Sequence, residues 1–141
     1  MNRFIRRTAL ATVVAAFGVM GGIASAEDVS VKLTGAEETP PVTTAATGAG
    51  KISIAKDGTV SGSVKTKGLV GTAAHIHEAP AGKAGPPIIT LTKSGDDTWT
   101  VPDGSKLTDA QLASLKAGNL YVNVHSDAHK DGEIRGQLKQ E

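Results

Sequence analysis

Short runs of alternating apolar and polar residues, separated by turn-forming residues, restrict this chain to a particular class of fold. The alternation is clear over 29–33, and Ile52 and Ile54 continue it in a second run. A period of two is typical of strands that bury one face. The sequence Lys56-Asp57-Gly58-Thr59 separates the second run from a third, and Asp-Gly accepts the positive φ of a tight hairpin turn. The pattern predicts a series of short antiparallel strands.

The same reasoning predicts strands over 29–33, 48–54, 60–64, 74–78, 88–91, 98–101, 119–125 and 133–138. One helix is predicted at about 109–117. Thr108 and Gln111 have the spacing of a capping box, and Gly118 stands where a helix C-cap is wanted. We therefore expect an all-β sandwich that carries one short helix.

The first 26 residues have the three parts of a secretory signal peptide. Arg3, Arg6 and Arg7 form a positive segment, 8–23 is uncharged and mostly apolar, and Ala24-Ser25-Ala26 is an A-x-A cleavage site. We expect cleavage after Ala26, a single domain over 27–141, and a protein that is periplasmic or secreted. With 115 residues left from 141, one domain with one core is expected.

The composition of the predicted mature chain excludes several kinds of partner and ligand. Removing three arginines leaves 12 basic side chains against 14 acidic ones, a net charge of −2. With no basic run left, nucleic acid is not expected as a partner, and without a second long apolar stretch neither is a membrane. The chain has no cysteine, so a bound metal would need histidine, carboxylate, carbonyl or water ligands.

All four histidines fall in two short segments. His75 and His77 are two residues apart in a predicted strand and so share one face. His125 lies in another predicted strand, on the face of Tyr121 and Asn123, and His129 follows in a turn. Imidazoles from neighbouring strands are a common source of transition-metal ligands.

We therefore predict a metal site made of His75, His77 and His125, and we include His129 as a possible fourth ligand. Three ligands would leave a coordination position open, whereas four would close the site. A ligand set with nitrogen and no sulfur suits Cu(II) or Zn(II), and the affinity order favours copper.

Several motifs resemble the CHRD domain in order and spacing. They are Leu33-Thr34-Gly35-Ala36-Glu37-Glu38-Thr39-Pro40-Pro41-Val42, Ala74-His75-Ile76-His77, Gly85-Pro86, Tyr121-Val122-Asn123-Val124-His125 and Gly132-Glu133-Ile134-Arg135-Gly136-Gln137-Leu138. The resemblance covers about 29–138 and implies an immunoglobulin-like, Greek-key β-sandwich. It implies little about activity, because fold alone does not determine function.

A weaker likeness concerns the metal. His75-Ile76-His77-Glu78 followed by a Gly-rich loop resembles the copper strand of Cu/Zn superoxide dismutase. That family also has a disulfide, a bridging histidine and a zinc-loop aspartate, which this sequence does not match. The likeness implies a two-histidine copper strand and does not extend to the activity.

Two other functions stay open beside metal binding and handling. One is a metal-free structural or protein-interaction domain in which the histidines are architectural. The other is a copper-dependent redox enzyme, although no catalytic residue is identified and a non-enzymatic role is favoured. Arg135 is expected to pair with a buried carboxylate, and Glu133 is either part of the metal surroundings or purely structural.

Overall fold

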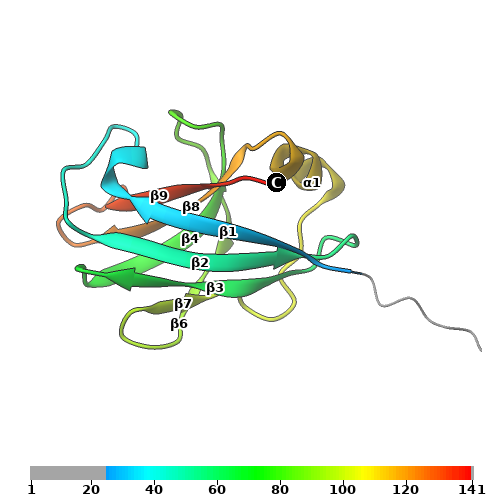
Figure 1. The fold of residues 1–141 in the computed structure, drawn as a ribbon, viewed down its shortest axis with the longest axis horizontal. Helices are drawn as coiled ribbons and strands as arrows, with labels where there is room; N and C mark the ends of the chain where they lie inside the picture. Colours follow the sequence, from blue (N-terminus) through cyan, green and yellow to red (C-terminus); the bar gives the residue numbers. More distant parts are fainter. Residues whose placement is uncertain (1–24, 141) are drawn as a thin grey trace, which may run out of the picture.

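The computed structural model describes residues 25–140. Residues 1–24, most of the predicted signal peptide, lie outside the described residues. Within the described part, Figure 1 shows a β-rich fold with one α-helix. The elements in chain order are β1 (Glu27–Thr34), the 3-10 turn η1 (Gly35–Glu37), β2 (Thr47–Ile54), β3 (Val60–Lys67), β4 (Gly71–Glu78), β5 (Pro87–Thr90), β6 (Thr92–Lys93), β7 (Thr98–Thr100), α1 (Asp109–Lys116), β8 (Leu120–Ser126) and β9 (Ile134–Leu138).

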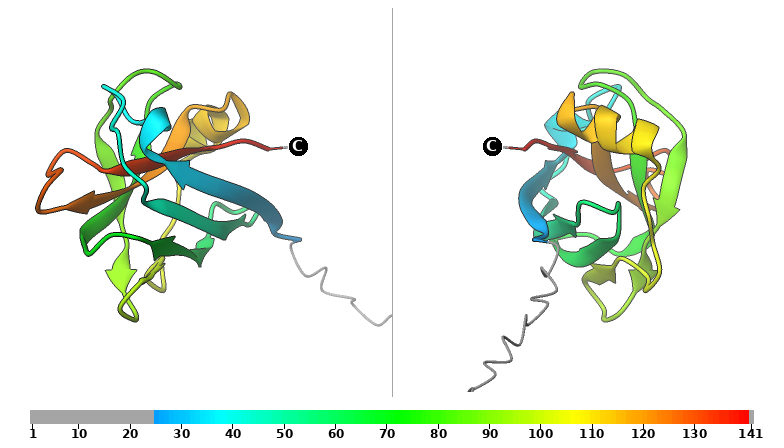
Figure 2. Two further views of the ribbon diagram at one scale, coloured as in Figure 1. Left: turned by 60° about the vertical axis from the view of Figure 1, so that its left-hand side comes forward. Right: turned by 90° about the vertical axis from the view of Figure 1, so that its right-hand side faces the viewer.

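The strands form one antiparallel sheet in the order β5-β4-β8-β9-β1-β2-β3-β7-β6. Its two ends, β5 and β6, are consecutive in the chain and are separated by Leu91, whose N–H donates to the carbonyl of Ala74 at 2.9 Å. The sheet therefore nearly closes on itself, which explains the rounded cross-section in Figure 2. The all-β class predicted from the alternation is confirmed.

The inward side chains of the strands form one apolar core. Alternate residues of β1 point inward, and Val29, Val31 and Leu33 are almost completely buried. The helix lies at one end of the sheet (Figure 1) and adds Leu115 to this core. Because the apolar atoms come from strands far apart in sequence, the core holds together non-local elements without any disulfide.

The helix has the predicted ends. Thr108 accepts from the N–H of Gln111, and the Gln111 side chain accepts from the N–H of Thr108, which completes the capping box. At the predicted hairpin, Gly58 has φ +91°, a conformation that favours glycine. The two-residue strand β6 and the turn η1 were not predicted, because both are too short for a periodic signal. In the described part of the chain, no helix has the length and apolarity needed to cross a membrane.

The outward face of β4, β8 and β9 is polar and yet largely buried. Asn123 is 2 % exposed, His77 8 % and Arg135 1 %. The loop over 79–86, between β4 and β5, covers part of this face through hydrogen bonds to Arg135, Gln137 and Tyr121. This covered polar face holds the candidate site.

Candidate metal centre

The pairing of β4 with β8 brings three of the four histidines together. The register places Ala73 opposite His125, His75 opposite Asn123 and His77 opposite Tyr121. His75 lies 5.4 Å from His77 and 4.9 Å from His125 between ring centroids. One nitrogen from each ring falls in a group whose atoms all lie within 4.8 Å of one another. We call His75, His77 and His125 the histidine cluster.

Backbone carbonyls hold two rings of the cluster in one tautomer. His77 Nδ1 lies 2.9 Å from the carbonyl oxygen of Gly85, and His125 Nδ1 lies 2.8 Å from that of Lys130. A carbonyl only accepts, so both Nδ1 atoms carry the proton and the neutral rings have a lone pair on Nε2. Metal-binding histidines usually donate their second N–H in this way.

The third ring is held by the cluster itself. His75 Nδ1 lies 3.0 Å from His125 Nε2, and since that Nε2 bears a lone pair, His75 donates to it. An ion bound by His125 would replace this hydrogen bond. Nitrogens around a tetrahedral zinc lie about 3.3 Å apart, given Zn–N bonds of about 2.0–2.1 Å. Small side-chain rotations would therefore bring the three nitrogens around one ion.

The surroundings keep two of the rings neutral. Burial lowers the pKa of His75, and the nearby His125 and His77 rings lower it further. Burial also lowers the pKa of His77, partly opposed by its hydrogen bond to Gly85. At neutral pH both rings therefore offer a lone pair instead of a positive charge, which is the state that binds a metal.

A stack of three side chains supports His77. The Tyr121 ring lies parallel to His77 at 4.8 Å and 5°, and the guanidinium carbon of Arg135 lies 3.4 Å from the centre of the Tyr121 ring. The Gly85 N–H donates to the Tyr121 hydroxyl at 3.1 Å, so the same loop residue contacts both His77 and Tyr121. The position of the loop and the orientation of the ring are thus coupled.

The expected pairing of Arg135 with a carboxylate is wrong. Its guanidinium donates to the carbonyls of Lys83 at 2.8 Å and Pro80 at 3.1 Å, and to the Gln137 side chain at 3.2 Å. Loop carbonyls that cannot join the sheet need donors when they are covered, and the five N–H groups of arginine supply several at once.

The remaining predicted residues lie apart from the cluster. His129 lies in the β8–β9 turn, where its backbone bonds to Ser126, and its ring is outside the group of three. The carboxylate of Glu133 accepts from Ser126 at 2.7 Å and Thr44 at 2.9 Å, so it ties the turn to the loop before β2. Glu133 therefore has a structural role.

Two buried polar residues beside the cluster were not identified from the sequence. Glu38 follows η1 and is 7 % exposed, and Asn123 lies in β8. Burial raises the pKa of Glu38 to about 7, although the charge of Arg135 and hydrogen bonds from Thr39 and Asn123 lower it. The sequence signal for Asn123 was its place on the face of His125. Glu38 lies in a loop, where no periodicity indicates burial.

Replacing Glu38 by glutamine is expected to change how stability depends on pH. The ordinary carboxyl pKa of 4.5 becomes about 7 in the fold, so in this window the native state keeps a proton that the unfolded chain releases. The contribution of Glu38 to the free energy of unfolding is therefore complete at acid pH and is lost as the pH rises through about 7. A full shift would be worth about 3.4 kcal/mol at about 1.4 kcal/mol per unit, and partial contact with water reduces this. We expect E38Q to gain about 1–2 kcal/mol relative to the wild type between about pH 5 and pH 8.

Urea unfolding of both proteins in the presence of a chelator measures this gain. The fold also lowers the pKa of His75 and of His77, but both residues are present in both proteins and their contributions cancel in the difference. A difference that does not change with pH would show that Glu38 is already ionised at the acid end.

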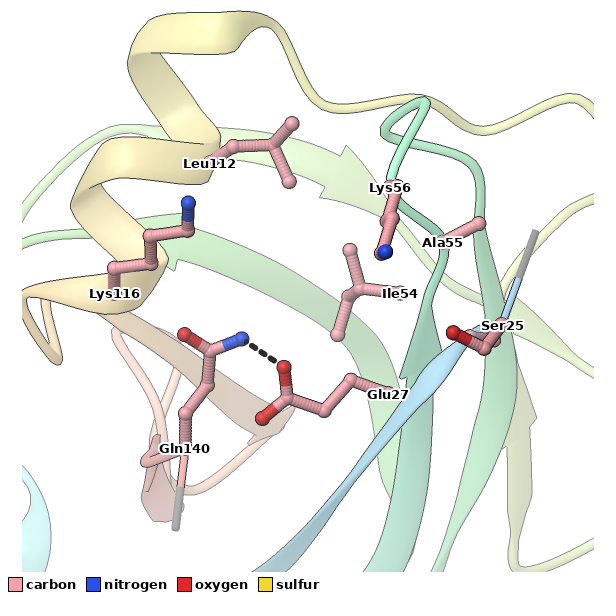
Figure 3. Close-up of a pocket in the computed structure, with 9 residues that line it drawn as sticks. Ser25, Glu27, Ile54, Ala55, Lys56, Leu112, Lys116 and Gln140 are labelled. Atoms are coloured by element: carbon pink, nitrogen blue, oxygen red, sulfur yellow. Dashed lines mark hydrogen bonds between the residues drawn. The ribbon is translucent and has the colours of Figure 1, made fainter.

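A hollow of about 520 Å³ lies away from the cluster, at the start of β1 and beside α1. Figure 3 shows the Gln140 side chain donating to Glu27, with Leu112 and Ile54 on the apolar side. Its charged side chains, Glu27, Lys56 and Lys116, are all exposed. It also includes Ser25 and Ala26, which the predicted cleavage would remove. The histidine cluster is therefore the better candidate site.

Comparison with known families agrees with the motifs. The family model described as the CHRD domain matches residues 29–138, which contain most of β1 and every later strand. Neither the search of curated proteins nor that of solved structures found a match.

Proposed function

The chain belongs to the CHRD domain family, and on that premise we propose that it is an exported protein that binds a transition-metal ion through His75, His77 and His125. Copper(II) is the favoured ion and zinc(II) the second choice. The role would be metal binding or handling in the periplasm or outside the cell, and not catalysis.

The observation that carries this proposal is that the Nδ1 atoms of His77 and His125 both donate hydrogen bonds to backbone carbonyls. Gly85 and Lys130 each accept one ring N–H, so His77 and His125 both carry their lone pair on Nε2. The Nε2 of His125 accepts from His75, a hydrogen bond that a bound ion would replace. The Nε2 of His77 is buried and has no hydrogen-bond partner among the described residues. A buried nitrogen without a partner costs stability, and a bound ion would remove that cost. The absence of cysteine and the imidazole ligands favour Cu(II) by the affinity order.

One observation favours the metal-free alternative. His75 and His125 already satisfy each other by a hydrogen bond, so these two rings are also stable as architecture. In that case the cluster would only tie β4 to β8, and added ions would bind no more strongly than to other surface histidines.

A thermal melt separates the two possibilities. The protein would begin at residue 27, which keeps every described strand and the helix, and would be stripped of metal before Cu(II) or Zn(II) is added. An ion that binds only the native state at a hundredfold excess over Kd adds about 2.7 kcal/mol. For a domain of this size that is a rise in Tm of roughly 10 °C.

His129→Ala is the matched control, because it removes a histidine outside the cluster. It should leave the rise intact, and a chelator should reverse the rise in both proteins. If neither ion raises Tm in the wild type, the metal proposal fails and the structural alternative takes its place. If His129→Ala abolishes the rise, the ligand set is a different one.

A further inference from the structure

Asn123 occupies the middle of the candidate site. It pairs directly with His75 across β4 and β8, and it lies two residues before His125 on the same face of β8. Asn123 is also one of the groups that influence the pKa of His77, so its amide lies beside that ring as well. All three cluster histidines are thus neighbours of one side chain.

The amide nitrogen of Asn123 lies beside Gly132, on the side of Glu38. A Cβ at Gly132 would lie 2.4 Å from Glu38 Oε1 and 2.7 Å from Asn123 Nδ2, so the carboxyl and the amide nitrogen converge on the space that this glycine leaves open. Gly132 has φ +126°, which other residues rarely adopt. With Nδ2 directed toward Glu38, the oxygen Oδ1 occupies the other end of the amide.

That oxygen is an acceptor without a partner. Asn123 is 2 % exposed, and its Oδ1 has no hydrogen-bond donor among the described residues. The Nε2 of the neighbouring His77 is also buried and has no hydrogen-bond partner among the described residues. Two buried electron-pair donors without partners cost stability unless a proton or a cation reaches them.

We propose that Asn123 Oδ1 is the fourth protein ligand of the bound ion, together with one nitrogen from each of His75, His77 and His125. This inference rests on the proposed metal site and specifies its coordination. A tetragonal set of nitrogen and oxygen ligands is typical of Cu(II), the ion favoured for this site. A His3Asn set fills four positions from the protein alone, which agrees with a binding role and leaves no equatorial position for a substrate.

The test uses copper EPR in oxygen-17-enriched water. Cu(II) prefers a tetragonal arrangement, and a water molecule in an equatorial position broadens the spectrum when its oxygen carries a nuclear spin. In the wild type the equatorial oxygen belongs to Asn123, so no such broadening is expected. In Asn123→Ala a water takes the vacant position, so broadening should appear and Cu(II) affinity should fall by about 10-fold or more. Asn119→Ala, in the connection before β8, is the matched control and should behave like the wild type.

Each outcome has one meaning. Broadening in the wild type as strong as in Asn123→Ala would overturn the inference, because water would then be the fourth ligand. Absence of broadening in both proteins would also overturn it, since another protein atom would fill the position. If Asn123→Ala does not fold, broadening in the wild type still overturns the inference, because water would then be the fourth ligand. A wild type without any bound copper would instead contradict the proposed function itself.

Discussion

Replacing His77 by alanine is expected to abolish the rise in Tm that Cu(II) produces in the wild type. His77 is the most buried member of the cluster, at 8 % exposure, and its Nε2 lacks a partner. Removing one of three imidazoles leaves two half-exposed rings, which bind an ion far more weakly. We expect a loss of at least about 100-fold in affinity, the upper end of what changes to the surroundings of a ligand produce.

The metal-free stability of His77→Ala also changes, and the experiment must separate the two effects. The substitution removes the ring stacked on Tyr121 and the bond to Gly85, which we expect to cost about 1–3 kcal/mol. The measured quantity is therefore the difference in Tm with and without ion, for each variant against its own metal-free form. His129→Ala serves again as the control. A full ion-induced rise in His77→Ala would remove this residue from the ligand set.

The local elements of this fold were predictable from short-range chemistry. Alternation located the strands to within a few residues, and the Thr108–Gln111 box located the helix, because each signal depends only on neighbours in sequence. The two histidine segments were also visible, since i and i+2 on a strand must share a face. Their contact in space depended on β4 pairing with β8, a non-local event that the alternation did not determine.

What covers the polar face could not be predicted from alternation. A period of two indicates which residues share a face, but it does not show that the 79–86 loop folds back over Arg135 and Tyr121. For this reason Arg135 was expected to meet a carboxylate, and Glu38 was not recognised as buried. His129 illustrates a related limit, because it lies three residues after the end of β8, where a turn allows its ring many directions.

Replacing Arg135 by leucine is expected to cost about 3 kcal/mol or more of unfolding free energy. The side chain is 1 % exposed, and its loss leaves the covered carbonyls of Pro80 and Lys83 without donors. Each buried group left unsatisfied costs about 1–3 kcal/mol. The cation–π contact with Tyr121 is lost as well. Urea unfolding without metal measures the change, with Lys139→Ala, an exposed cation just after β9, as the control expected to stay within about 0.5 kcal/mol.

Arg135→Leu should also weaken ion binding. Arg135 acts on His77 only indirectly, through the Tyr121 ring and the 79–86 loop. Arg135 anchors the segment that carries Gly85, and the Gly85 carbonyl holds the His77 ring in its tautomer. Loosening that acceptor is expected to reduce Cu(II) affinity by about 10-fold or more. Arg135→Lys keeps the charge and loses the planar contacts to two carbonyls, so it should lose most of the affinity while long-range electrostatics are preserved. If Arg135→Lys binds copper like the wild type, the positive charge alone is sufficient and the loop does not orient His77.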